Sequence, residues 1–272
     1  MLGSGSKGNA FALLDGNSAL LLDAGFSLRE LDRRLAAAEI EARSVVGIAL
    51  THEHGDHAAG ALRFAARQRI PLLTSLGTWQ ALTNGREPCD FLPLDSRGGA
   101  GVGPFTVSCC PTSHDAAEPI AIGVVLADGV SIGVAYDLGR PTQQVRFFLR
   151  NRHCLVLEAN HDTVLLRTSG YPPVVQERIA GPGGHLSNLD AARLIEEVYH
   201  DGLSTIVLAH LSQRCNSGPA ARAVVEPVLR SSGFTGALLL AEQSGPMAPV
   251  TLRLPEQGTL FGGSQRQRAA AG

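Results

Sequence analysis

Three histidines and an aspartate lie within six positions of the segment Thr51-His52-Glu53-His54-Gly55-Asp56-His57. An apolar run at 45–50 precedes this segment and predicts a buried strand, and a helix is expected from Ala58 onward. Neutral imidazole and carboxylate groups bind divalent metals, and a loop at a strand end can direct several of them to one point. The alternative is a solvated polar turn, but nine histidines in 272 residues rarely cluster this closely by chance. The segment therefore predicts a metal site.

The spacing within this segment also predicts two metal ions. His52 and His54 are two positions apart, so their side chains share a face of an extended segment. Asp56 and His57 are adjacent and point differently as the chain enters the helix. One pair can therefore serve one ion and the second pair another. Two ions about 3.5–4 Å apart can bind both the attacking and the leaving oxygen of a displacement.

The pattern His-x-His-x-Asp-His resembles the signature of the metallo-β-lactamase superfamily, and the superfamily's later ligands also have candidates. His114 resembles the third-motif histidine, whereas Asp137 and His210, each at the end of an apolar run, resemble the bridging aspartate and the last histidine. The resemblance implies two divalent ions per chain, with Zn²⁺ as first choice and Mn²⁺ or Fe²⁺ as alternatives. It assigns His52, His54 and His114 to one ion and Asp56, His57 and His210 to the other, with Asp137 bridging.

The fold implied by this resemblance is α/β, a four-layer αββα sandwich in a single domain over residues 1–258. Hydrophobic residues make up 44% of the chain and charged residues 18%, which suits a chain that buries a large core. Helices are expected at 27–39, 58–69, 75–83, 142–150, 187–200 and 218–231. Strands are expected at 10–14, 19–22, 45–50, 71–74, 156–157, 206–208, 237–240 and 250–254, with short strands through 88–136. Residues 259–272 are expected to form a disordered tail.

Composition further predicts a cytoplasmic protein. The N-terminus lacks a basic segment followed by an apolar stretch, and no apolar run approaches about 18 residues, so neither a signal peptide nor a membrane span is expected. The five cysteines are odd in number and form no Cys-x-x-Cys pair. Reduced thiols are therefore expected rather than a disulfide framework.

Two further residues favour phosphodiester chemistry. Glu158 ends an apolar run, and His185 lies in the segment Gly183-Gly184-His185-Leu186-Ser187-Asn188. This order resembles the phosphodiesterase branch of the superfamily, in which a strand-end glutamate partners a histidine shortly before the last metal histidine. The resemblance implies that Glu158 holds His185 and that His185 protonates the leaving sugar oxygen. The alternative interpretation makes His185 an N-cap or a surface histidine.

Residues 3–9 form a glycine- and serine-rich loop whose amides and hydroxyls can meet phosphate oxygens. Lys7, the only lysine of the chain, lies in this loop, although the loop could equally be a plain tight connection. Ser187 and Asn188 could contact substrate or serve as N-caps. The predicted substrate-binding residues are Ser4, Ser6, Lys7, Asn9, Ser187 and Asn188.

These motifs together look most like the compact YycJ/WalJ-type exonucleases of the superfamily. The expected reaction is metal-assisted phosphodiester hydrolysis at nucleic-acid ends, with DNA favoured over RNA, Asp56 and Asp137 orienting the attacking water, and His185 as the acid. The net charge of −2 excludes a protein that coats nucleic acid through a broad basic face. Three alternatives remain: a small-molecule phosphodiesterase, a lactonase or thioesterase of the same fold, and a non-catalytic metal-binding adaptor.

Overall fold

The first sheet is built from the N-terminal part of the chain and begins with the predicted hairpin. Its strands, in spatial order, are β1 (Phe11–Asp15), β2 (Ser18–Leu22), β3 (Val45–Ala49), β4 (Leu72–Thr74) and β5 (Phe91–Pro93). β1 and β2 pair antiparallel, whereas β2 to β5 run parallel. The computed structural model describes residues 1–254, so the tail predicted at 259–272 lies outside the described residues.

The second sheet has the order β12-β11-β10-β9-β8-β7-β6. Its strands are β6 (Ala100–Val102), β7 (Phe105–Pro111), β8 (Ile120–Val125), β9 (Ser131–Ala135), β10 (Cys154–Glu158), β11 (Thr205–Ala209) and β12 (Ala237–Leu240). β6 to β9 pair antiparallel, and β9 to β12 run parallel. β9, β10 and β11 are buried at every position, which explains why their sequences are almost continuously apolar.

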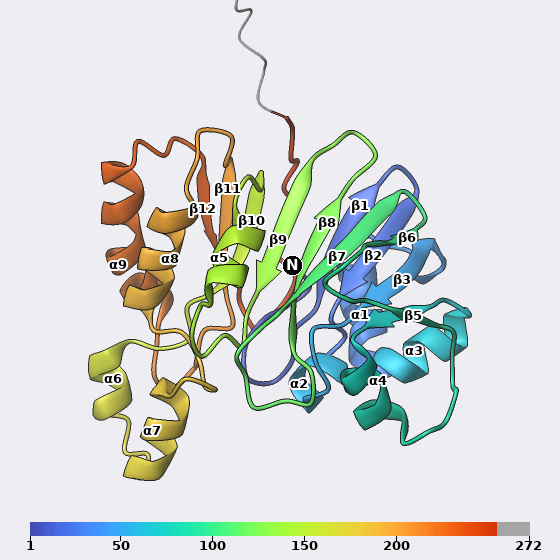
Figure 1. Ribbon diagram of the computed structural model, residues 1–272, viewed down its shortest axis with the longest axis horizontal. Coiled ribbons are helices and arrows are strands. Elements are labelled where there is room, and N and C mark those ends of the chain that lie inside the picture. Colours follow the sequence, from blue (N-terminus) through green and yellow to red (C-terminus); the bar gives the residue numbers. More distant parts are fainter. Residues whose placement is uncertain (255–272) are drawn as a thin grey trace, which may run out of the picture.

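Helices cover the outer faces of both sheets and complete the αββα layers (Figure 1). The helices beside the first sheet are α1 (Leu28–Ala37), α3 (Ala61–Gln68) and α4 (Leu76–Thr83), with the short 3₁₀ helix η1 (Ala42–Ser44) before β3. The helices beside the second sheet are α5 (Gln143–Leu149), α8 (Asn188–Val198) and α9 (Gly218–Ser231). The predicted fold class is confirmed.

Three local differences from the sequence-based prediction have physical reasons. The helix expected at 58–69 is split into α2 (Gly55–Ala58) and α3, because the Gly60 N–H donates to the Ala24 carbonyl and the Asp56 carbonyl accepts from the Asn9 N–H, so the helical bond between Gly60 and Asp56 is not made. Two helices were not predicted: α6 (Thr163–Arg167) is only five residues long, and α7 (Pro173–Ala180) has no buried residue and therefore no apolar face to give a period. The strand predicted at 250–254 was wrong, because the chain there pairs with no strand of either sheet.

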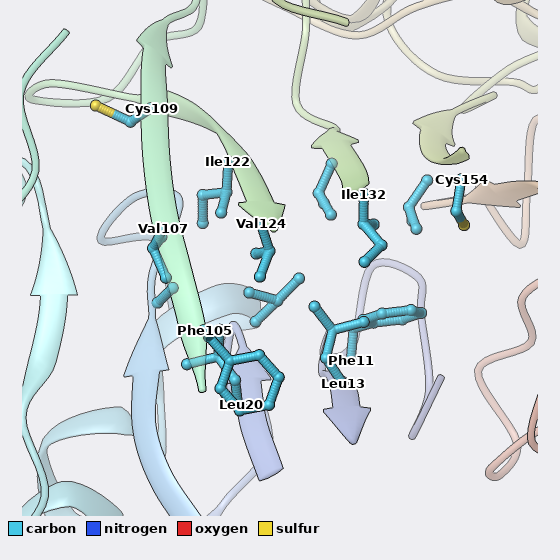
Figure 2. Packing of buried hydrophobic residues seen from close by; sticks show 14 of the residues in the cluster. Phe11, Leu13, Leu20, Phe105, Val107, Cys109, Ile122, Val124, Ile132 and Cys154 are labelled. Atoms are coloured by element: carbon cyan, nitrogen blue, oxygen red, sulfur yellow. The ribbon is translucent and has the colours of Figure 1, made fainter. Parts of the chain in front are cut away.

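Apolar side chains from the facing sides of the two sheets form the central core (Figure 2). Phe11 and Leu20 come from the first sheet, and Phe105, Ile122 and Ile132 come from the second; all are buried. Burying one such side chain contributes about 1.5–3 kcal/mol relative to leaving it in water. The core therefore holds the two sheets in a fixed relation, and loops at their common edge can be positioned accurately.

Two expectations about the environment of the chain can be compared with the structure. Among the helices of residues 1–254, none combines the length and the hydropathy needed to cross a membrane. All five cysteines lie within those residues, and each is a free thiol. No disulfide framework is found in that part of the chain.

Candidate metal centre and active site

Polar side chains that follow the buried strands meet at the carboxyl edge of the two sheets. β2 and β3 run parallel, as do β9, β10 and β11, so each set of strands ends on one side. Asp23, Asp137 and His210 follow such strands, and their φ angles are 57°, 52° and 55°. Positive φ is uncommon for residues other than glycine and costs free energy. Three such positions at one edge indicate a site whose side-chain placement is tightly required.

The first predicted ligand group, His52, His54 and His114, is assembled at this edge. One ring nitrogen from each histidine lies within 4.8 Å of the others. His114 Nδ1 lies 3.2 Å from the Gly184 carbonyl oxygen, which can accept its proton, and His114 Nε2 then lies 3.3 Å from His54 Nδ1. His52 Nδ1 lies 3.0 Å from Thr51 Oγ1, which leaves His52 Nε2 facing the other histidines. The lone pairs of the three rings can therefore converge on one ion.

The second predicted group, Asp56, His57 and His210, also has its ligand atoms within 4.8 Å of one another. Asp56 Oδ2 lies 3.5 Å from His57 Nε2 and 3.4 Å from His210 Nε2. Asp137 lies between the two groups, because its Oδ2 is 2.6 Å from His57 Nε2 and 3.4 Å from His52 Nε2. This position is the one that a bridging ligand requires.

Unpaired buried atoms show that these residues fit divalent metal ions. His52 Nε2 and Asp137 Oδ1 are buried and have no hydrogen-bond partner within residues 1–254. His185 Nδ1 and His210 Nδ1 lie 2.9 Å and 3.0 Å from Asp137 Oδ1, but both are hydrogen-bonded to Glu158 instead. A buried polar atom without a partner is destabilising, and coordination to a cation removes that cost.

The charges of the centre also favour the binding of metal cations. Burial alone would lower the pKa of His57, but Asp137 and Asp23 raise it well above its ordinary value. Burial alone would also lower the pKa of His210, but Asp137, Asp56 and Glu158 raise it well above its ordinary value. Both pKa values are raised because the centre buries more negative charge than positive charge. Either protons on the histidines or metal cations can balance that negative charge. Metal binding would release those protons, since a histidine ligand must be neutral.

Asp23 is a functional residue that sequence reasoning missed. Its carboxylate accepts hydrogen bonds from His57 Nδ1 at 2.6 Å and from the Thr51 backbone N–H at 2.8 Å. Because Nδ1 carries the proton, His57 Nε2 presents its lone pair to the metal centre. The signal was present in the sequence: Asp23 ends the apolar run 19–22, as Asp137 ends another.

Replacing Asp23 with asparagine is expected to lower metal affinity about 10–100-fold, the usual effect of losing such a supporting partner. The amide introduced by Asp23→Asn cannot hold the His57 proton as firmly as the carboxylate does, so the ring can rotate or change tautomer. Competition with a chromophoric chelator would measure the affinity. The matched control is Asp90→Asn, an exposed carboxylate before β5. Unchanged affinity in Asp23→Asn would contradict this role.

Glu158 joins the predicted proton donor to the metal centre. Its carboxylate is fully buried; Oε1 accepts from His185 Nδ1 at 2.8 Å and from His210 Nδ1 at 2.9 Å. Oε2 accepts from the backbone N–H groups of Leu138 and Leu186. Burial alone would raise the pKa of Glu158, but the two histidines lower it to about 2. The carboxylate therefore stays charged and orients both rings.

His185 lies at the mouth of the centre, with 23% of its side chain exposed. Its ring lies 5.5 Å from the His114 ring and 5.3 Å from the His210 ring, measured between centroids. Since Nδ1 is held by Glu158, Nε2 is the atom that can meet a substrate. Burial alone would lower the pKa of His185, but Glu158 and Asp137 raise it to about 9.

The loop at 3–9 lies against the metal centre, and its four candidate substrate residues divide into two pairs. Ser4 and Asn9 are buried: Ser4 Oγ donates to Asn9 Oδ1 at 2.7 Å and accepts from the His210 N–H at 2.8 Å. Asn9 Nδ2 lies 3.1 Å from His57 Nε2. Ser4 therefore holds the His210 backbone, and Asn9 packs beside the His57 ring nitrogen that faces the metal centre. Ser6 and Lys7 are exposed and can face a substrate.

Ser187 and Asn188 also have their polar atoms engaged within the protein. Ser187 Oγ caps α8 by accepting from the Asp190 N–H at 3.1 Å and donates to Asp190 Oδ2 at 2.6 Å. The Asn188 side chain exchanges two hydrogen bonds with Asn216. Both residues fasten the start of α8 directly after His185, and Ser187 is the N-cap of that helix.

Comparison with known proteins agrees with this geometry. A sequence profile described as the beta-lactamase superfamily domain matches residues 19–210. The chain is 32% identical over 257 residues to the exodeoxyribonuclease YycJ of Bacillus anthracis, which covers 93% of this chain and 97% of that protein. It is 30% identical over 221 residues to the exodeoxyribonuclease WalJ of Streptococcus pneumoniae, which covers 79% of this chain and 82% of that protein.

Solved structures with a similar fold share little sequence with this chain. The metallo-beta-lactamase fold protein YhfI of Bacillus subtilis superposes with a TM-score of 0.65 at 18% identity, over 90% of this chain and 96% of that one. The short form of human tRNase Z superposes with a TM-score of 0.60 at 16% identity, over 91% of this chain and 98% of that one. At such low identity these likenesses show the fold alone.

Proposed function

The chain belongs to the metallo-β-lactamase superfamily of metal-dependent hydrolases, and on this basis we propose that it is an exonuclease acting on nucleic-acid ends. The observation that carries the proposal is the Glu158–His185 pair, which sets an imidazole beside the metal centre. A lactone or thioester hydrolase has little need for such a proton donor. The names of the two bacterial relatives support DNA over RNA as the substrate.

The metal centre is proposed to hold two divalent ions in the two ligand groups, with Asp137 between them. When bound, the ions supply Lewis acidity, lowering the pKa of the attacking water to roughly 7 and neutralising charge on the phosphoryl oxygens. Zinc is the first choice because imidazole nitrogen and carboxylate oxygen suit it, and manganese or iron are the alternatives.

Asp56 is the carboxylate of the centre that water and substrate can reach. Its side chain is 28% exposed, whereas that of Asp137 is 3% exposed. In the proposed mechanism Asp56 accepts a hydrogen bond from the attacking water. This hydrogen bond orients the water so that a lone pair of the water oxygen faces phosphorus. Lys7 and Ser6, exposed on the neighbouring loop, hold the non-bridging phosphate oxygens.

His185 completes the reaction on the leaving-group side. Glu158 fixes the ring through Nδ1, so Nε2 donates its proton to the sugar oxygen as the phosphorus–oxygen bond breaks. The Glu158 carboxylate also stabilises the positive charge on the His185 ring before the proton is transferred. Ser187 and Asn188, which fasten the start of α8, keep the preceding histidine from moving away.

The proposed function predicts nucleotides or short products released from the ends of oligonucleotides. Purified protein loaded with zinc or manganese would be assayed on 5′- and 3′-labelled single- and double-stranded DNA and RNA. Lactones, thioesters and cyclic nucleotides would form the comparison panel. Turnover of lactones or thioesters without oligonucleotide cleavage would identify a carbonyl hydrolase. Turnover of small phosphodiesters alone would identify a small-molecule phosphodiesterase.

A further inference from the structure

A pocket of about 580 Å³ lies beside the segment that follows His210 and beside Ser4 of the loop at 3–9. It is lined by side chains from residues 211–222 and 240–244 and by Ser4. Ser4 connects the pocket to the centre, because its hydroxyl accepts a hydrogen bond from the His210 N–H. The volume is within the range of about 300–1,000 Å³ that holds one small molecule of drug size. A single nucleoside is a ligand of that size.

The pocket walls combine apolar surface with uncharged polar groups. Leu211 and Leu240 supply apolar contact area. Gln213 lines the pocket and is exposed, so its side-chain amide can pair with a ligand. The two charged lining residues, Arg222 and Glu242, have opposite signs. This wall suits a flat neutral group with polar edges, such as a nucleobase, better than it suits a phosphate.

Gln243 contacts both this pocket and the loop that contains Lys7. Its Oε1 accepts a hydrogen bond from the Lys7 backbone N–H at 2.8 Å, and its Nε2 donates to the Gly8 carbonyl oxygen at 2.9 Å. Gln243 also lines the pocket. A phosphate held at the loop and a base held in the pocket are therefore neighbours, as they are within one nucleotide.

We propose that this pocket binds the nucleobase of the terminal nucleotide, so that the enzyme recognises a strand end through its last base. The inference rests on the proposed exonuclease function for the identity of the substrate. A base at an end has one stacking neighbour, so moving it into a pocket loses fewer contacts than moving an interior base. The pocket thus gives a physical reason for acting on ends.

Filling the pocket tests the proposal. A Cβ at Gly218 would lie 3.7 Å and 4.0 Å from the two methyl carbons of Leu240, which is ordinary contact, so Gly218→Leu extends a side chain along the apolar wall. The matched control is Ala223→Leu, at an exposed position of the same helix, α9. Because Gly218 precedes Pro219, the unfolding temperature of both variants is measured first.

The readout is binding of deoxyadenosine 5′-monophosphate compared with 2-deoxyribose 5-phosphate, which lacks the base, in titration calorimetry. Wild-type protein and Ala223→Leu are expected to bind the nucleotide about tenfold more tightly than the sugar phosphate, because the base buries apolar surface against Leu211 and Leu240. Gly218→Leu is expected to bind both compounds equally. Equal binding by the wild type, or an intact preference in Gly218→Leu, would overturn the proposal.

A second variant keeps the test valid if Gly218→Leu does not fold. Gln213→Ala removes one polar partner at an exposed position and is expected to reduce the preference for the base about two- to tenfold. An undiminished preference in this variant counts against the proposed wall. A base preference in a protein that cleaves no oligonucleotide would retain the pocket and refute the nuclease. Cleavage of oligonucleotides by a protein with no base preference would retain the nuclease and refute the base pocket.

Discussion

Replacing His185 with alanine is expected to slow the release of nucleotides from nucleic-acid ends by about 10²–10⁴-fold. The sugar alkoxide that leaves is strongly basic and needs the proton that His185 Nε2 carries. The p-nitrophenolate of bis(p-nitrophenyl) phosphate leaves without a proton, so hydrolysis of that ester is expected to be nearly unchanged. Metal content should also be unchanged, because Glu158 still holds His210 and two backbone amides.

The comparison of the two substrates separates an acid from a ligand. His200→Ala is the matched control, because His200 Nε2 lies 3.0 Å from the Arg152 carbonyl oxygen and takes no part in the metal centre. Kinetics on both substrates and elemental analysis of each variant provide the measurements. Equal losses on the two substrates, or a missing ion in His185→Ala, would show that His185 is a ligand or a structural residue.

Glu158→Gln is expected to disturb both the proton donor and a metal ligand, whereas the sequence alone connects Glu158 only to the proton donor His185. The carboxylate accepts hydrogen bonds from both His185 and His210, so it orients the proton donor and a metal ligand together. Its substitution therefore lowers turnover of both substrates, whereas His185→Ala discriminates between them. For this reason His185→Ala is the variant that isolates acid catalysis.

Replacing Asp137 with asparagine is expected to reduce turnover of both substrates by about 10³-fold or more. Several kcal/mol of transition-state stabilisation depend on the metals, and each 1.36 kcal/mol corresponds to about tenfold in rate. Asparagine has the same shape and tolerates the left-handed backbone found here, so the fold should persist while the charge between the two ligand groups is lost. Elemental analysis is expected to find two divalent ions in the wild type and fewer in this variant.

The matched control for Asp137→Asn is Asp201→Asn, which removes a carboxylate from an exposed position before β11. This control is expected to keep both its metal content and its rate. Two tightly held ions and a wild-type rate in Asp137→Asn would contradict a bridging role for Asp137. A wild-type protein that saturates at a single ion would contradict the two-ion centre altogether.

Much of the fold could be predicted from the sequence because its signals are local. Strands such as β3 and β11 are short apolar runs. α1 begins at Leu28, directly after its N-cap Ser27, whose hydroxyl accepts a hydrogen bond from the Glu30 N–H. Hydrophobic period and capping chemistry act over a few residues, so they can be read without knowing what packs nearby. The same reading fails for α6, which is only five residues long.

The metal-ligand candidates could also be found from the sequence, because each has a ligand side chain in a distinctive local position. His52 to His57 form one dense cluster, and Asp137 and His210 each follow an apolar strand. Asp23 follows the same rule after β2 and could have been found by applying it again. What no local rule contains is which of these side chains hydrogen-bond to one another.

Only the tertiary structure decides those partnerships, because they depend on which strand ends lie side by side. Glu158 reaches both His185 and His210 since β10 lies next to β11 and the start of α8 is close to both. Ser4 and Asn9 are polar and look available in sequence, yet they are buried against His210 and His57. A side chain's chemistry is local, whereas its burial and its hydrogen-bond partners are properties of the packed molecule.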